Sequence, residues 1–157
     1  MAITGITTSL WFDQVAGEAV AFYVDLFPDS RILQTTTYGP NDRYPEGTPV
    51  TVSFELFGQP FLAINAGSEF SPTPAISFQV FCDTQQEIDR LWDALTDGGR
   101  EDMCGWCADR YGVSWQIIPR ELPSLVSHPD ADARQRVTAA MRGMRRLDLA
   151  ALQAAAG

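Results

Sequence analysis

Seven side chains that could bind or polarise a small molecule fall on one face of the strands that the sequence predicts. Strands are expected over residues 3–12, 50–57 and 75–82 and within 105–119, where apolar residues alternate with polar ones between turn signals. Successive strand residues point to opposite sides of a sheet, so this alternation separates two faces. The mixed face carries Thr7, Ser9, Trp11, Glu55, Ser77, Gln79 and Gln116.

This mixed face has the chemistry of a ligand cavity. A few placed hydroxyls and amides in a largely apolar wall orient a small, partly apolar or aromatic molecule. Thr7, Ser9, Trp11, Ser77, Gln79 and Gln116 are therefore predicted to bind a ligand. Glu55 is the one acid on the face, so it is the natural general acid or base if a proton is transferred. The pattern also fits an open sheet whose polar face simply meets water.

Two other motifs have spacings that carry chemistry elsewhere. Cys104-Gly-Trp-Cys107 has the spacing of a redox dithiol or of half a zinc site. It lies in a turn-rich stretch rather than at the start of a helix, and no second Cys or His pair completes a zinc site, so structural thiols are expected. His128, the only histidine, sits in a Ser-His-Pro-Asp turn before a helix, which argues against a catalytic triad.

Composition excludes several classes of function. All 11 basic residues are arginine, so a Schiff-base lysine and a P-loop lysine are both absent. The formal net charge of -9 disfavours nucleic-acid partners and anionic membranes. No apolar run approaches the roughly 18 residues of a membrane span, and no signal segment is evident. We therefore expect a cytoplasmic protein without membrane or nucleic-acid partners.

The chain repeats one arrangement of elements. A strand, a helix over 16–27 with Asp13 as its N-cap, and strands over 31–38, 50–57 and 61–65 form the first copy. A shortened copy follows, with Asp83 or Thr84 capping its helix. The predicted boundaries are a first module at 1–66, a second at 75–120 and a helical extension at 121–157, all within one domain. Repeated half-sheets predict a concave surface between them.

The residues that carry a family resemblance are spread along the chain. They are Leu10-Trp-Phe-Asp13, Phe22-Tyr23, Leu26-Phe-Pro28, Gly58-Gln-Pro-Phe61, Cys104-Gly-Trp106 and Asp109-Arg-Tyr-Gly-Val-Ser-Trp-Gln116. These strings resemble the PhnB-like branch of the glyoxalase and dioxygenase superfamily, the vicinal oxygen chelate proteins, over nearly the whole chain, tail included. The resemblance implies an α+β fold in which two β-α-β-β-β modules form a cupped mixed sheet, followed by the helical tail. It also implies a homodimer.

Members of this branch often carry the name 3-demethylubiquinone 3-methyltransferase, and the residues disagree with that name. A methyltransferase of the common nucleotide-binding fold needs a glycine-rich loop around its cofactor, and the chain contains no Gly-x-Gly. Methyl transfer is therefore disfavoured, and no cofactor is expected.

The resemblance also implies where metal-dependent relatives place their ligands. Those four positions fall on Thr7, Leu62, Ser77 and Gln116 in this chain. Hydroxyls, an amide and a hydrocarbon are poor ligands for a divalent ion, and the nearby Glu55 and Asn65 supply only one carboxylate. No metal site is therefore predicted.

Three functions stay open at this point. The first is a metal-free protein of this superfamily that binds a small, partly apolar or aromatic metabolite in the cup between its modules. The second is a lyase, isomerase or dioxygenase that uses a weakly bound divalent metal near Gln116 and Glu55. The third is a structural interaction module.

Overall fold

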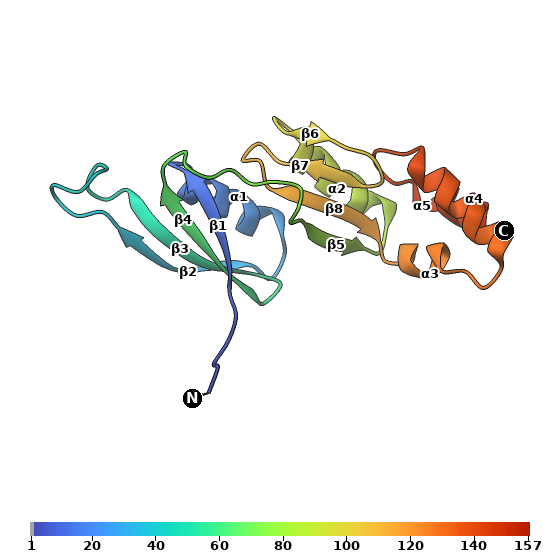
Figure 1. Cartoon of the computed structure of the whole chain (residues 1–157), viewed down its shortest axis with the longest axis horizontal. Helices are drawn as coiled ribbons and strands as arrows, with labels where there is room; N and C mark the ends of the chain where they lie inside the picture. Colours follow the sequence, from blue (N-terminus) through green and yellow to red (C-terminus); the bar gives the residue numbers. More distant parts are fainter. Residues whose placement is uncertain (1) are drawn as a thin grey trace. The chain divides into compact units, whose positions relative to one another are not determined.

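The computed structural model describes residues 2–157, which form two compact units, one ending at Pro72 and the other running from Thr73 to Gly157. Each unit has a four-stranded mixed sheet and a helix that packs against it (Figure 1). The α+β fold of two β-α-β-β-β modules with a C-terminal helical tail is confirmed. In the described residues, no helix is both long and apolar enough to cross a membrane.

The first unit contains the sheet β1-β4-β3-β2 and helix α1. Its elements are β1 (Thr8–Asp13), α1 (Ala16–Leu26), β2 (Arg31–Thr37), β3 (Pro49–Leu56) and β4 (Gln59–Ala66). β1 runs parallel to β4, and the other pairs are antiparallel. α1 packs against β3 and β4 and buries Val52, Phe54 and Phe61 beneath it. The alternate residues of these strands lie on the face that α1 leaves open.

The start of α1 differs from the sequence-based expectation. Asp13 is the last residue of β1, and the N-cap is Val15, which supplies no side-chain hydrogen bond. The cap comes instead from β4, where Oδ1 of the buried Asn65 accepts a hydrogen bond from the N–H of Ala16 at 2.9 Å. Nδ2 of Asn65 donates to the carbonyl of Pro49 at 2.8 Å. The assignment of Asp13 as N-cap was wrong because the donor at the helix start is satisfied by a residue from another strand.

The second unit repeats this arrangement with shorter strands. Its module consists of β5 (Phe78–Cys82), α2 (Gln85–Thr96), β6 (Arg100–Glu101), β7 (Trp106–Ala108) and β8 (Ser114–Pro119), in the sheet order β5-β8-β7-β6. Thr84 and Glu87 form a capping box at the start of α2, so Thr84 is the cap among the two residues considered. α2 packs against β5, β7 and β8 through Ile88, Leu91, Trp92 and Leu95.

The tail belongs to the second unit. It consists of α3 (Leu122–Val126), α4 (Ala131–Arg142) and α5 (Leu149–Ala156). A buried cluster joins it to the sheet, because Ile118 at the end of β8 packs with four tail residues, Leu122, Val137, Leu147 and Leu152. The tail is therefore part of the core of this unit.

Candidate functional site

A cleft of about 500 Å³ lies against the face of the second sheet that α2 leaves open. Side chains alternate between the two faces along each strand, and this alternation decides which residues form the floor of the cleft. In the parallel β5–β8 pair, Gln79 lies opposite Gln116 and Phe81 lies opposite Ile118, while Trp106 of β7 lies opposite Gln116 from the other side. These five residues line the cleft. The side chains between them in sequence, such as Ile117 and Cys107, are buried on the other face.

Three of the predicted ligand-binding residues are joined by hydrogen bonds at this floor. Nε2 of Gln116 donates to Oγ of Ser77 at 2.7 Å, and Nε2 of Gln79 donates to Oε1 of Gln116 at 2.9 Å. Gln116 is therefore held at both ends of its amide group. In the described chain no hydrogen bond uses Oε1 of Gln79, which leaves that acceptor for a ligand.

Every residue that lines the cleft is uncharged. The sheet supplies two aromatic rings, Phe81 and Trp106, and two amides. The helices α3 and α4 supply the opposite wall with Leu122, Pro123, Val126, Thr138 and Met141. A wall of this kind gives apolar contact and one fixed polar anchor, the arrangement expected for a small, mostly apolar ligand.

The other four predicted residues lie in the first unit. Ser9 and Trp11 are on the open face of β1, where Ser9 aligns with Leu62 and Ser53, and Trp11 aligns with Ile64 and Thr51. Thr7 is exposed and precedes β1. These polar residues are spread over separate rows of the sheet.

Trp11 and Glu55 each have a partner in the first unit. Nε1 of Trp11 donates to the carbonyl of Gly67 at 2.7 Å, and its ring contacts Phe70 edge to face at 5.0 Å. Glu55 forms an ion pair with Arg31 of the neighbouring strand β2 at 2.7 Å. This pairing explains how an acid is held on the open face. A role for Glu55 in proton transfer stays a prediction.

The cysteines of the second unit differ in their surroundings. Cys104 lines the cleft, whereas Cys107 is buried on the opposite side of β7. Burial, with a smaller contribution from Asp109, raises the pKa of Cys107 from 9.0 to about 12. Burial likewise raises the pKa of Cys82 to about 11. A buried, protonated thiol is unreactive, so Cys107 is a poor partner for redox exchange with Cys104.

The residues present do not fit the divalent metal that the fold family implies. Both functional atoms of the Gln116 amide are used by Ser77 and Gln79, and Leu62 has no donor atom. Oδ1 of Asn65 is used by the start of α1. Within residues 2–157, no three His, Cys, Asp or Glu side chains gather closely enough to hold a metal ion. The donor set is that of a hydrogen-bonding wall.

Sequence reasoning missed part of this site. Trp106, Cys104 and Ile118 line the cleft but were not assigned to it, although the alternation of Trp106 with Cys107 could have placed Trp106 on the open face. Thr138 and Met141 gave no comparable signal. They belong to a tail helix, and only the folded chain brings that helix to the sheet.

Comparisons with known proteins match the two modules. The model of the 3-demethylubiquinone-9 3-methyltransferase family matches residues 4–118, so the likeness ends before the tail and the expectation that it includes the tail was wrong. The PhnB protein from Bacillus cereus, a proposed 3-demethylubiquinone-9 3-methyltransferase, is 38% identical with a TM-score of 0.68. That match covers 73% of this chain and 98% of the other. No curated protein matches.

Two more distant structures share the fold. Protein PA1353 from Pseudomonas aeruginosa is 19% identical, with a TM-score of 0.57 over 70% of this chain and 92% of its own. The fosfomycin resistance protein FosX from Listeria monocytogenes is 11% identical, with a TM-score of 0.54 over 75% of this chain and 93% of its own. With the family match and the identity to the Bacillus cereus protein, the chain belongs to the 3-demethylubiquinone-9 3-methyltransferase family, the PhnB-like branch of the vicinal oxygen chelate superfamily.

Proposed function

We propose that the protein binds a small, uncharged and partly aromatic metabolite in the cleft of the second unit, and that it does so without a metal ion. The observation that carries this proposal is the composition of the cleft, which combines two rings, an anchored amide pair and an apolar opposite wall, all uncharged. A site formed jointly by both modules, with Thr7, Ser9, Trp11 and Glu55 taking part, stays a prediction from the sequence.

The expected charge of the ligand follows from the uncharged residues that line the cleft. Moving an ionised group from water into a cleft that offers no opposite charge costs several kcal/mol. A neutral hydroxyl, carbonyl or amide loses much less, because it can exchange its water for the Gln79 amide. The cleft therefore selects against anions and cations and accepts a neutral polar group attached to a flat apolar body.

Methyl transfer is not the function that this cleft supports. A sulfonium methyl donor carries a positive charge and an amino-acid group, and both would need counter-charges that the lining residues lack. The family name describes a set of related sequences, and the chemistry of the second unit points to binding of a neutral molecule.

The proposal is tested with two probes of the same shape and different charge. Naphthamide is neutral and naphthoate is anionic near neutral pH, and both fit a cleft of about 500 Å³. Protein-observed NMR titration of the whole chain should give saturable shifts around Gln79 and Trp106 with naphthamide. Its affinity should exceed that of naphthoate at least tenfold, the equivalent of about 1.4 kcal/mol.

A variant and a matched control assign the site. Gln116→Leu removes the amide that bonds to both Ser77 and Gln79 and should weaken naphthamide binding about fivefold, since a hydrogen bond of this kind is worth about 1 kcal/mol. Gln59→Leu removes an exposed glutamine from β4 of the first unit and should change nothing. Absence of saturable naphthamide binding, or equal binding of naphthoate, would refute the proposal. Binding that requires added zinc, nickel, manganese or iron would favour the metal-dependent alternative instead.

A further inference from the structure

The tail supplies nearly half of the wall of the cleft. Of the eleven lining residues, five come from α3 and α4: Leu122, Pro123, Val126, Thr138 and Met141. Figure 1 shows these helices, in orange and red, following β8 in the second unit. The open face of a β-α-β-β-β sheet would otherwise have no second wall within this unit, so the tail turns a sheet face into a cleft.

The tail is fixed to the sheet at the start of its course. The chain passes directly from β8 into α3, and Ile118 and Leu122 belong both to the buried cluster and to the wall of the cleft. Val137 of α4 is fully buried in the same cluster. The cleft residue Thr138 follows it directly in sequence, and Met141, four residues after Val137, lines the cleft and also packs against the cluster. Because residues four apart share a helix face, Met141 lies on the same side of α4 as Val137, and the residues of α4 that line the cleft border its buried stripe.

The tail is fixed again after α4. The N–H of Cys104 donates to the carbonyl of Met144 at 2.7 Å, and the N–H of Gly105 donates to that of Arg145 at 2.8 Å. A Cβ at Gly105 would come within 2.9 Å of Leu147, which itself has no exposed surface. The bend that contains Cys104 is thus bonded to the segment that directly follows α4, the helix that supplies part of the opposite wall.

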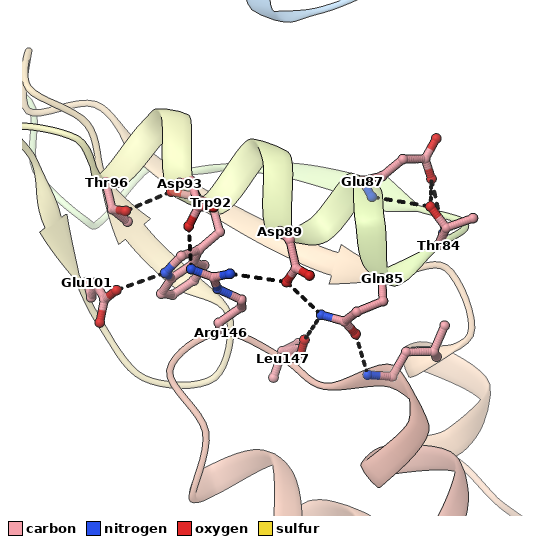
Figure 2. A network of polar contacts seen from close by, with 11 residues as sticks. Thr84, Gln85, Glu87, Asp89, Trp92, Asp93, Thr96, Glu101, Arg146 and Leu147 are labelled. Atoms are coloured by element: carbon pink, nitrogen blue, oxygen red, sulfur yellow. Dashed lines mark hydrogen bonds and ion pairs between the residues drawn. The ribbon is translucent and has the colours of Figure 1, made fainter.

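A polar network between α2 and the tail segment around Arg146 and Leu147 adds a third attachment (Figure 2). Gln85 donates from Nε2 to the carbonyl of Leu147 at 3.1 Å and accepts at Oε1 from the N–H of Leu149 at 2.9 Å. Arg146 bonds to Asp89 at 3.2 Å and to Asp93. The hydrogen bond from Gln85, together with the charge of Arg146, holds the pKa of Asp89 below its usual value.

We propose that this tail, residues 121–157, is the roof of the ligand cleft and that Met141 decides which ligands fit beneath it. The family match ends at residue 118, and the Bacillus cereus protein is almost completely covered by 73% of this chain. The roof therefore lies outside the shared modules, where it can differ without changing the fold. Met141 is unbranched and adaptable, so its side chain can set the depth of the space above Gln79 and Gln116. The claim that Met141 selects ligands rests on the proposed function. The claim that the tail forms the roof of the cleft does not.

The covering can be tested without any ligand through Cys104. It lines the cleft, while Cys82 and Cys107 are buried with raised pKa values, so Cys104 is the reactive thiol. The rate of modification by the neutral reagent N-ethylmaleimide, followed by mass spectrometry, reports access to the cleft. Met141→Trp should slow the modification of Cys104 several-fold. Arg146→Ala, which removes the bonds to Asp89 and Asp93, should accelerate it.

The matched control is Gln135→Trp. It adds similar bulk to an exposed position of α4 that does not line the cleft, and it should leave the rate unchanged. Near-ultraviolet circular dichroism and the unfolding midpoint verify that each variant is folded. Equal modification rates of Cys104 in Met141→Trp and the wild type would refute the proposal that the tail covers the cleft.

Selectivity is tested with the naphthamide titration and a longer probe, p-phenylbenzamide. Met141→Trp should weaken naphthamide binding at least tenfold, and Met141→Ala should shift the preference toward the longer probe by a similar factor. Unchanged preference in both variants would refute the assignment of Met141. If the wild type binds neither probe while Met141→Trp still protects Cys104, the proposed function is refuted, and the proposal that the tail covers the cleft is supported.

Discussion

At the scale of single residues, Asp109 shows how a loop is built to support the site. Its buried carboxylate accepts the N–H groups of Tyr111 at 2.9 Å and Val113 at 3.0 Å through Oδ1, and Nε1 of Trp115 at 2.8 Å through Oδ2. Gly112, with a φ of 86°, allows the turn between these two N–H groups. The turn sets the start of β8, and with it the position of Gln116.

We predict that Asp109→Ala lowers the free energy of unfolding by about 3 kcal/mol, because three donors lose their acceptor in surroundings that water does not reach. Asp109→Asn should cost less, since Oδ1 can still accept from the loop. Urea unfolding followed by tryptophan fluorescence measures both. Asp97→Ala is the control, because its ion pair with Arg110 is at the surface and should contribute no more than about 1 kcal/mol. Similar losses at the two positions would contradict this role.

Cys107 predicts a change of stability with pH. Its pKa rises from 9.0 in an ordinary thiol to about 12 in the folded protein, chiefly because it is buried. Above about pH 9 the unfolded chain loses this proton while the folded chain keeps it, so the free energy of unfolding should fall as pH rises toward about 12, by at most about 1.4 kcal/mol per unit. Below about pH 9 the contribution is fully present.

The comparison is with Cys107→Ala. Its urea unfolding curves, taken from about pH 8 to about pH 11, should lose stability with a shallower slope than those of the wild type. Truncation of a buried side chain also lowers stability by an amount that does not depend on pH, so the slope is the readout. Parallel slopes would show that Cys107 is not protected from ionisation.

At the scale of elements, the two helices of the modules start in different ways. α2 carries its own cap, because Oγ1 of Thr84 accepts the N–H of Glu87 at 3.2 Å and Glu87 returns a bond to the N–H of Thr84 at 3.0 Å. α1 has no such local signal and depends on Asn65 of β4. A local cap is visible in a sequence, and a cap borrowed from a strand is not.

Because the two caps differ, removing them should lower the free energy of unfolding by unequal amounts. Thr84→Ala should lower the free energy of unfolding by about 1 kcal/mol, the usual value for a lost cap. Asn65→Ala should cost about 3 kcal/mol, since it leaves the N–H of Ala16 and the carbonyl of Pro49 without partners in the interior. Thr84→Ser, which keeps the hydroxyl, is the control. Equal losses in the two alanine variants, measured by urea unfolding, would argue against the borrowed cap.

At the scale of the whole molecule, strand β2 leaves an exposed sheet edge. It is an edge strand of its sheet, every residue of it is exposed, and Ile32 and Leu33 are among the exposed apolar side chains. An exposed edge with apolar side chains is a pairing surface that proteins normally cover. This feature supports the homodimer that the family resemblance implied, which stays a prediction.

Native mass spectrometry of the full chain should therefore show twice the mass of the sequence, with no stoichiometric divalent metal. Leu33→Arg should shift the population toward the single chain, because like charges on two copies repel at a shared edge. Gln59→Arg, which adds the same charge at an exposed position of β4 rather than on the edge strand, is the control. If the wild-type protein has the mass of a single chain at micromolar concentration, the homodimer prediction is refuted.

The sequence by itself determined most elements of the modules and the two faces of their strands, because both follow from spacings within a few residues, but it missed the two-residue strand β6. It thereby placed Ser77, Gln79 and Gln116 on one face, and the folded sheet joins them by hydrogen bonds. Only the tertiary structure decided the cap of α1, the ion pair of Glu55 with Arg31, and the seating of α4 over the second sheet. Each of these depends on contacts between residues far apart in the chain, and local periodicity contains no information about such contacts.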